Sequence, residues 1–315
     1  MLESNKNLLT QLIDKHRDTS LYVLVDYSNL LIKQATKLNN LSVNLGGVIY
    51  PTGGVYGLCN FTERVLKTYP NAVIIYVLDS ATGSDSRKQI NPLYKSKRKP
   101  SEYKDVLFSF NDKVINMLSL TPNVYFSKVE GYECDDVISQ IGFDLKELNK
   151  QVVIFSEDKD YWQLLPFGIE VSRQFDKGFI NITDDIVLDT FGVISSKLLK
   201  FRALKGDTSD NLPSPVRLTD KFRNKFVEIW SETNSFNETL KSLYSLHKKE
   251  CIKINENKLA IYNNLLIMDL QKYRNEINQF EYSIFKSSYK NGVGLVNMFD
   301  LKNYQKFLKE NYNVN

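Results

Sequence analysis

Histidine and cysteine are both scarce in this sequence, and their scarcity excludes several kinds of active site. His16 and His247 are the two histidines, and neither has a second histidine or a pair of cysteines at ligand spacing. A zinc site and a Ser–His–Asp triad are therefore not indicated. The three cysteines show no metal-ligand spacing, and an odd number in a chain of 315 residues favours a reducing compartment over a disulfide scaffold.

Long apolar runs and phosphate-binding glycine motifs are also missing. No uncharged apolar stretch approaches the length of a membrane span, and the first twenty residues contain no apolar signal core. The glycines between residues 46 and 57 are followed by no GKS or GKT, so they do not form a P-loop. We therefore expect a cytoplasmic protein without a membrane partner.

Acidic residues stand where short apolar runs end. The runs at residues 21–25, 73–78 and 152–156 are rich in β-branched residues and apolar on both faces, which is typical of buried parallel strands. In an open α/β sheet, ligand-binding groups gather beyond the carboxyl ends of the strands. Acids that are far apart in the sequence are therefore expected to converge there. Nine acids have such positions: Asp26, Asp79, Glu133, Asp135, Asp136, Asp158, Asp160, Asp207 and Asp210.

This set of acids predicts a metal site. Carboxylates that share a pocket repel one another unless hard cations such as Mg²⁺ or Mn²⁺ neutralise them. Two such cations can orient a water and stabilise both the attacking and the leaving oxygens of a phosphodiester displacement. For any single acid, a helix N-cap or a turn is an equally good interpretation.

A basic segment follows the second of these acids. Between residues 87 and 104, seven basic residues, including Lys97, face a single acid, Glu102. We expect Arg87, Lys95 and Arg98 to bind backbone phosphate and to offset developing charge. Tyr94 offers a ring on which an unpaired base can stack. Taken alone, the segment is better explained as a solvated charged loop, but beside a strand-end aspartate and eight other acids the phosphate-binding interpretation is favoured.

The pattern along the chain predicts two regions. Residues 21–194 alternate predicted strands with helices at about 54–69, 106–120, from 132 and near 161–165, and end in a last strand or edge hairpin at 169–182. Residues 195–315 consist of helical pieces without buried strands, and we place the domain boundary there. Residues 1–20 form an extension, for which a short helix at 7–17 and a flexible segment are both compatible.

Six blocks, in this order, resemble the signature blocks of the structure-specific 5′-nuclease superfamily. That superfamily includes flap endonucleases, the 5′-nuclease domain of bacterial DNA polymerase I and phage 5′-exonucleases. An ordered set of blocks is far more specific than any single motif. The blocks are LVDYSNLL, YPTGGVYGL, the arginine- and YKSKR-bearing stretch after LDS, GYECDDVI, SEDKDYWQLL and LKGDTSDNLP.

The resemblance implies an α/β, PIN-like core with a mostly parallel central sheet flanked by helices. It also implies a basic arch over residues 80–105, either helical or disordered, and a C-terminal helical domain of the helix–three-turn–helix type that grips duplex DNA. Two Mg²⁺ ions are implied, for which Mn²⁺ substitutes. Carried over by residue, Asp26, Asp79, Glu133 and Asp135 serve the first ion, Asp158, Asp160, Asp207 and Asp210 serve the second, and Asp136 acts through water.

Basic residues are also carried over from this resemblance. Lys95 resembles the arch cation that contacts the scissile phosphate, and Lys33 matches a position that handles the 5′ strand. After Asp210 the chain departs from the family, because PSPVRLTDK replaces a glycine-rich hairpin of the form PGVxGIGxK. Backbone contacts that need those glycines are then in doubt. Side-chain charge is expected to substitute, from Arg217, Lys221, Arg223 and Lys225.

This replacement and the tail are similar to the ribonuclease H of T-even bacteriophages. The leading interpretation is therefore a phage replication enzyme in the host cytoplasm. It would be a monomeric Mg²⁺-dependent 5′-3′ exonuclease or flap endonuclease with ribonuclease H activity, removing RNA primers from RNA–DNA and DNA–DNA duplexes. A single-strand-binding protein or sliding clamp is an expected partner.

Two other functions were compared with this interpretation. A PIN-type endoribonuclease would cut single-stranded RNA, but it needs no duplex-gripping domain, and residues 195–315 argue against it. A catalytically inactive DNA-structure-binding protein is the second alternative. The presence of all the expected acids argues against a decayed site.

Overall fold

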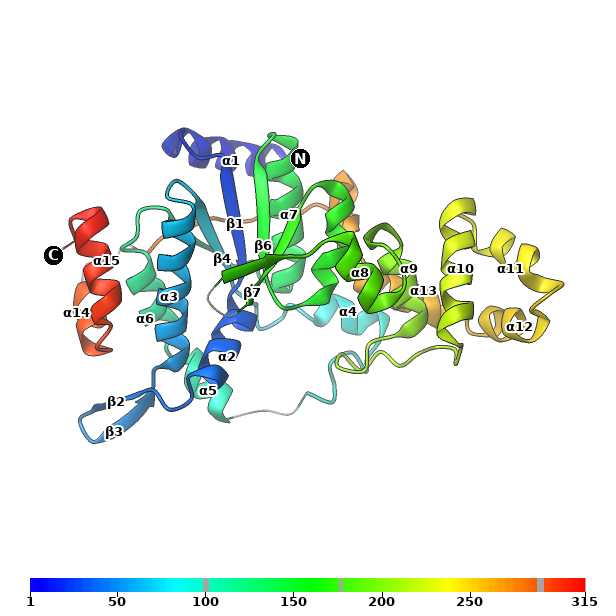
Figure 1. Cartoon of the computed structure of the whole chain (residues 1–315), viewed down its shortest axis with the longest axis horizontal. Helices are drawn as coiled ribbons and strands as arrows, with labels where there is room; N and C mark the ends of the chain where they lie inside the picture. The colour runs from blue at the N-terminus through cyan, green and yellow to red at the C-terminus, as the bar shows by residue number, and fades with distance from the viewer. Residues whose placement is uncertain (99–101, 176–177, 288–291, 315) are drawn as a thin grey trace.

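A six-stranded sheet forms the centre of the fold (Figure 1). The computed structural model describes residues 1–98, 102–175, 178–287 and 292–314. Neighbouring strands are parallel except the last pair, which is antiparallel. Across the sheet the strands are β5 (Val124–Ser127), β4 (Val73–Val77), β1 (Leu21–Asp26), β6 (Gln151–Phe155), β7 (Glu170–Phe175) and β8 (Gly178–Asn181).

The central strands are apolar on both faces because helices cover both sides of the sheet. Tyr22 and Leu24 of β1 belong to one buried cluster, together with residues of α1 (Glu3–Lys15) and α7 (Cys134–Glu147). Val23 and Val25 point to the opposite cluster, which contains residues of α2 (Tyr27–Lys37), α3 (Gly53–Thr68) and α6 (Asn111–Leu118). The predicted PIN-like α/β core with a mostly parallel sheet is confirmed.

A helical region lies beyond the β7 side of the sheet (Figure 1). Helix α9 (Ser195–Lys205) joins this region to the core by packing on the 3₁₀ helix η1 (Lys159–Phe167). Within the region, α9 packs on α13 (Lys258–Met268). The helices of this region are α8 (Asp184–Phe191), α9 (Ser195–Lys205), α10 (Asp220–Thr233), α11 (Phe236–Tyr244), α12 (Lys248–Glu256) and α13 (Lys258–Met268). The short turns η2 (Gln271–Arg274) and η3 (Glu276–Asn278) follow.

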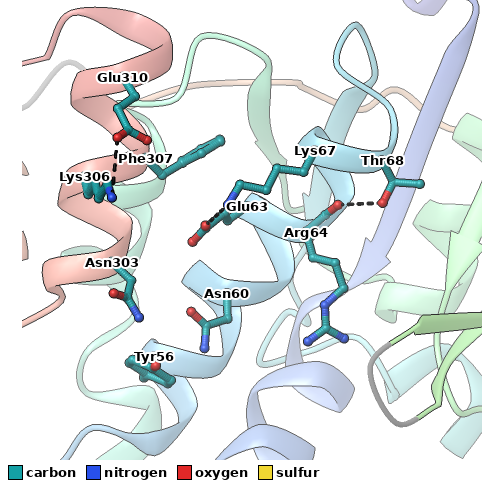
Figure 2. Close-up of a pocket in the computed structure, with 10 residues that line it drawn as sticks. All are labelled: Tyr56, Asn60, Glu63, Arg64, Lys67, Thr68, Asn303, Lys306, Phe307 and Glu310. Carbon is teal, nitrogen blue, oxygen red and sulfur yellow. Dashed lines mark hydrogen bonds and ion pairs between the residues drawn. The ribbon is translucent and has the colours of Figure 1, made fainter.

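The tail crosses back to the opposite end of the molecule, as Figure 1 shows. Helices α14 (Gly292–Met298) and α15 (Lys302–Tyr312) pack on α6 and α3. A polar groove of about 560 Å³ separates part of α15 from α3 (Figure 2). Ion pairs within each helix line it, Lys67 with Glu63 at 2.6 Å and Lys306 with Glu310 at 3.7 Å. The tail thus lies with the sheet core rather than with α9–α13.

Two further segments frame the site. A hairpin of β2 (Ser42–Leu45) and β3 (Val48–Pro51) projects from the core and turns at Gly46 and Gly47, whose positive φ values suit glycine. The basic segment begins in α4 (Asp85–Ile90) and continues into α5 (Glu102–Phe108). Residues 99–101, within the predicted arch, lie outside the described residues. No helix in the described ranges is long and apolar enough to cross a membrane.

Candidate metal centre

The ends of three adjacent strands bring carboxylates to one pocket. Asp26 is the last residue of β1, where it also caps α2 by accepting the Asn29 backbone N–H at 3.0 Å. Asp79 follows β4, and its Oδ1 accepts the backbone N–H of Cys134 at 3.1 Å. Asp158 follows β6 and accepts the N–H of Asp160 at 2.9 Å. These side chains line a pocket of about 180 Å³ together with Glu133, Asp135, Lys95 and Arg98.

The remaining predicted acids lie around this pocket. Asp207 and Asp160 both form ion pairs with Arg202, and Asp210 forms one with Arg98 at 2.5 Å. Asp136 instead caps the N-terminus of α7. Its side chain is 1% exposed and accepts the backbone N–H of Glu133 at 3.2 Å. The prediction that Asp136 serves a cation through water is therefore corrected, because this side chain caps its own helix and does not line the pocket.

Arg87 is buried among the acids rather than presented to solvent. Its side chain is 3% exposed and forms ion pairs with Glu133, with Asp135 at 3.0 Å and with Asp136 at 2.7 Å. Its Nε donates to the carbonyl of Ile267 at the end of α13, at 3.0 Å. The prediction that Arg87 contacts backbone phosphate is corrected, since these acids already bind its guanidinium.

Tyr94 is also turned inward. Its ring is 3% exposed, and its hydroxyl lies 3.0 Å from Glu133 Oε2 and 3.2 Å from Asp210 Oδ2. The predicted base-stacking role is therefore wrong for this conformation, because the ring face is covered. Lys95 lies 2.6 Å from Glu133 and lines the pocket, and the Arg98 side chain is 57% exposed at its rim. These two cations keep access to a phosphate.

The electrostatics of the pocket show an excess of negative charge. Burial raises the pKa of Asp26 to about 7, and the neighbouring charges of Asp79, Asp158 and Asp135 add to that rise. Burial also raises the pKa of Asp160, and Asp158 raises it further. The pKa of Asp135 is lowered instead. Burial alone would raise it, but the positive charges of Arg87 and Lys95 outweigh the effect of burial. Burial therefore raises the pKa even of Asp160, which pairs with Arg202, whereas Asp135, which faces both Arg87 and Lys95, stays ionised more readily.

This donor set suits hard divalent cations. Carboxylate oxygens are the ligands that Mg²⁺ and Mn²⁺ prefer, and such ions would offset the repulsion that raises the pKa of Asp26. Within the described residues, no three Asp, Glu, His or Cys side chains are already arranged to hold a metal ion. Arginine and lysine face these oxygens instead, so a cation would have to compete with those ion pairs.

Comparison with known proteins decides the family. The model of the N-terminal, resolvase-like domain of 5′-3′ exonucleases matches residues 20–192. The chain belongs to this 5′-3′ exonuclease family. The resemblance to the structure-specific 5′-nuclease superfamily is thereby confirmed, and the candidate site lies inside the matched segment except for Asp207, Asp210 and Arg202.

Two relatives of this chain are similar in sequence. The 5′-3′ exonuclease of Buchnera aphidicola (Acyrthosiphon pisum) is 27% identical, over 61% of this chain and 67% of that protein. The thermostable DNA polymerase I of Thermus aquaticus is 30% identical over 81% of this chain, which corresponds to 29% of the polymerase. The chain therefore spans less than a third of the polymerase that it matches.

A solved structure extends the shared fold to most of the chain. The bacteriophage T5 D15 flap endonuclease, in a pseudo-enzyme–product complex with DNA and metal ions, has a TM-score of 0.60 and 17% identity. The match covers 93% of this chain and 98% of the T5 chain. The fold common to both includes the helical region and not only the sheet core.

The residues predicted to bind nucleic acid fall into three groups. Lys97, Arg217, Lys221 and Lys225 are exposed. Lys33 forms an ion pair with Glu157 beside the pocket. The prediction that Arg223 binds nucleic acid is corrected. Arg223 is 6% exposed, pairs with Asp220 and donates to the carbonyl of Leu218 at 3.1 Å, so it does not present its charge to a ligand.

Sequence reasoning missed two residues that contact the site. Arg202 on α9 pairs with Asp160 and Asp207. Gln163 is 2% exposed and donates to the carbonyl of Met268 at 3.0 Å, which joins η1 to the end of α13. The sequence offered one signal for Arg202, which stands between the apolar residues Phe201 and Ala203. Gln163 carried none, because only the tertiary fold brings α13 beside it.

Proposed function

We propose that this chain is a Mg²⁺-dependent 5′-3′ nuclease that hydrolyses phosphodiester bonds in RNA–DNA and DNA–DNA duplexes at 5′ ends or flaps. The observation that carries the proposal is the pocket at the strand ends, where five carboxylates face Lys95 and Arg98. The T5 flap endonuclease complex, which holds DNA and metal ions, supports a substrate and a cofactor of this kind. Mn²⁺ is expected to substitute for Mg²⁺.

Two groups of carboxylates would hold the cations. Asp26, Asp79, Glu133 and Asp135 form the first group, and Asp158, Asp160, Asp207 and Asp210 form the second. Two bound divalent ions would supply a nucleophilic water and stabilise charge on the phosphate oxygens. Lys95 and Arg98 bind the scissile phosphate at the pocket rim, while Tyr94 and Arg87 fix the carboxylates of Glu133 and Asp135 in place.

The biological role that fits this activity is removal of RNA primers from the lagging strand in phage-type replication. The match to DNA polymerase I, a replication enzyme, supports this role. Residues 21–194 then form the catalytic domain, and helices α9–α13 bind the duplex. A single-strand-binding protein or a sliding clamp is a partner of such an enzyme.

The test is a 5′-labelled primer–template in two matched forms, one with an RNA primer and one with a DNA flap. We expect short 5′ products with Mg²⁺ and none after EDTA is added. Absence of metal-dependent release from both substrates would refute the proposal. Cleavage of single-stranded RNA without a 5′ duplex junction would support a PIN-type endoribonuclease instead.

A variant at the second carboxylate group separates catalysis from binding. Asp160→Asn is expected to bind the labelled substrate with nearly unchanged affinity and to lower the cleavage rate by roughly a thousandfold, since one anionic ligand is lost. Asp189→Asn, at an exposed acid on α8, is the matched control and should cut normally. Unchanged cleavage by Asp160→Asn would exclude the assigned role of this group.

A further inference from the structure

Arg202 is a buried cation placed between two carboxylates of the second group. It is 8% exposed and comes from the last turn of α9. Its Nη1 lies 2.5 Å from Asp160 Oδ1 and its Nη2 lies 2.6 Å from Asp207 Oδ2. One guanidinium therefore spans two acids that come from η1 and from the turn after α9.

The anchoring of Arg202 differs from that of Arg87, the other arginine among these acids. Arg87 donates to the carbonyl of Ile267 as well as to carboxylates, so the backbone holds it in place. Within the described part of the chain, the Nε of Arg202 has no hydrogen-bond partner. Its hydrogen bond and its ion pairs go to Asp160 and Asp207. The guanidinium of Arg202 is thus held by the oxygens that a cation would need.

Like charges in one pocket oppose each other strongly when the pocket excludes water. A divalent ion bound to Asp160 or Asp207 would lie within a few ångströms of the guanidinium of Arg202. That ion can therefore bind only if it displaces Arg202 or if its affinity is lowered by repulsion from the guanidinium. Arg202 in turn offsets the charge of these two acids and holds them in place when no ion is bound, because burying them unpaired would be costly.

We propose that Arg202 is a built-in counter-cation that competes with a divalent ion for Asp160 and Asp207 and so weakens the second metal site. This inference rests on the proposed function, because it assumes that these acids bind a divalent ion. In this role Arg202 is a positioning residue and does not touch the substrate. It raises the ion concentration that is needed to fill the second site.

The experiment is calorimetric titration of the full chain with Mn²⁺ alone, without nucleic acid. We expect Arg202→Met to tighten one class of site by roughly tenfold or more, since a repelling charge is removed, and to leave the other class unchanged. Arg202→Lys keeps the charge and should stay near the unmodified affinity. Arg223→Met is the matched control, because Arg223 is also a buried arginine but pairs with Asp220 on α10.

Thermal unfolding of the same proteins gives a second measurement. Arg202→Met should unfold at a lower temperature without metal and show a larger upward shift with Mn²⁺, because bound ligand stabilises the folded state according to its affinity. An unchanged or weaker Mn²⁺ affinity in Arg202→Met would overturn the inference. If Arg202→Met does not fold, Arg202→Gln, which is also neutral, must show the same tightening. If the unmodified chain binds no Mn²⁺ at all, the proposed function itself fails.

Discussion

Hydrogen-bond donors buried beside the carboxylates determine the shape of the candidate site at the scale of single residues. Arg87 lies against Glu133, Asp135 and Asp136, and the Tyr94 hydroxyl lies between Glu133 and Asp210. Removing one partner of a buried charge pair costs about 3–5 kcal/mol, because the remaining charge is left without compensation. These donors therefore fix where the carboxylate oxygens lie before any cation or substrate binds.

Tyr94 provides a direct test of this role. Tyr94→Phe keeps the ring and removes the hydroxyl that contacts Glu133 and Asp210. We expect kcat for 5′ cleavage to fall by about tenfold or more, since a hydrogen bond to a charged group is worth about 1.5–3 kcal/mol. Substrate affinity, measured by binding in Ca²⁺, should remain unchanged. If the ring instead stacks on a base, Tyr94→Phe will be neutral and Tyr94→Leu will lose affinity.

The acids of the site could be predicted from the sequence, whereas their donors could not. Asp26 and Asp79 each follow a buried strand, and parallel strands place such residues at one edge. Arg87 and Tyr94 belong to a basic segment whose composition suggests exposure, yet both are buried by contact with distant acids. Arg202 lies in a helix that a sequence pattern assigns to a separate region. The direction in which a basic side chain points depends on tertiary contacts that local patterns do not contain.

At the scale of elements, the buried strands and most helices of residues 21–194 follow from the hydrophobic pattern. The hydrophobic pattern does not predict the hairpin of β2 and β3, because each strand has four residues and, among the side chains that the structure describes there, only Val43 and Tyr50 pack on the core; the glycine pair at 46 and 47 indicates the turn alone. For the N-terminal segment, the sequence is compatible with both a short helix and a flexible extension. It forms α1, which docks through Leu9 and Leu12 and through a hydrogen bond from Asn5 to Asp144 of α7.

The contact between α1 and α7 predicts a pH dependence of stability. Burial raises the pKa of Asp144 above the usual value of 3.8, even though Tyr282 donates to it at 3.0 Å. The folded chain then holds a proton that the unfolded chain has released. The contribution of Asp144 to stability is therefore fully present below pH 3.8 and is lost as the pH rises through the folded pKa.

Urea unfolding from about pH 4 to 8 checks this expectation against Asp144→Asn. The difference in unfolding free energy between the two proteins should shift in favour of Asp144→Asn as the pH rises, by at most about 1.4 kcal/mol per pH unit. Asp14→Asn, at an exposed acid of α1, is the control and should show no such trend. A difference that does not depend on pH would mean that Asp144 ionises normally in the folded chain.

At the scale of the whole molecule, the sheet core holds a helical region on one side and the tail on the other (Figure 1). The composition of residues 195–315 predicted helices without strands, but it could not separate α9–α13 from α14 and α15, because both stretches are helical. Contacts with α3 and α6 place the tail on the core. Surfaces that contact a long duplex are therefore sought at the start of α10, which begins at the end of the segment 213–221 that departs from the resembled glycine-rich hairpin.

Lys221 and Lys225 are the exposed cations in the first turns of α10, four residues apart and hence on one face. Each lysine that contacts a phosphate releases counterions, so its loss lowers the slope of log affinity against log salt by about 0.9. The double variant Lys221→Gln/Lys225→Gln should bind duplex more weakly at low salt, with a slope smaller by up to about two. Fluorescence anisotropy with a labelled duplex at several salt concentrations measures both quantities.

The controls for this prediction use residues that differ in burial or position. Lys6→Gln/Lys309→Gln changes the net charge equally but lies on α1 and α15, so its slope should match that of the unmodified chain. Arg223→Gln removes a charge from the same helix, yet Arg223 is buried against Asp220 and should leave the slope unchanged. An equal loss of slope in the two double variants, with about half that loss in Arg223→Gln, would show that net charge, and not α10, governs duplex binding. The helical region would then have no specific role in gripping the substrate.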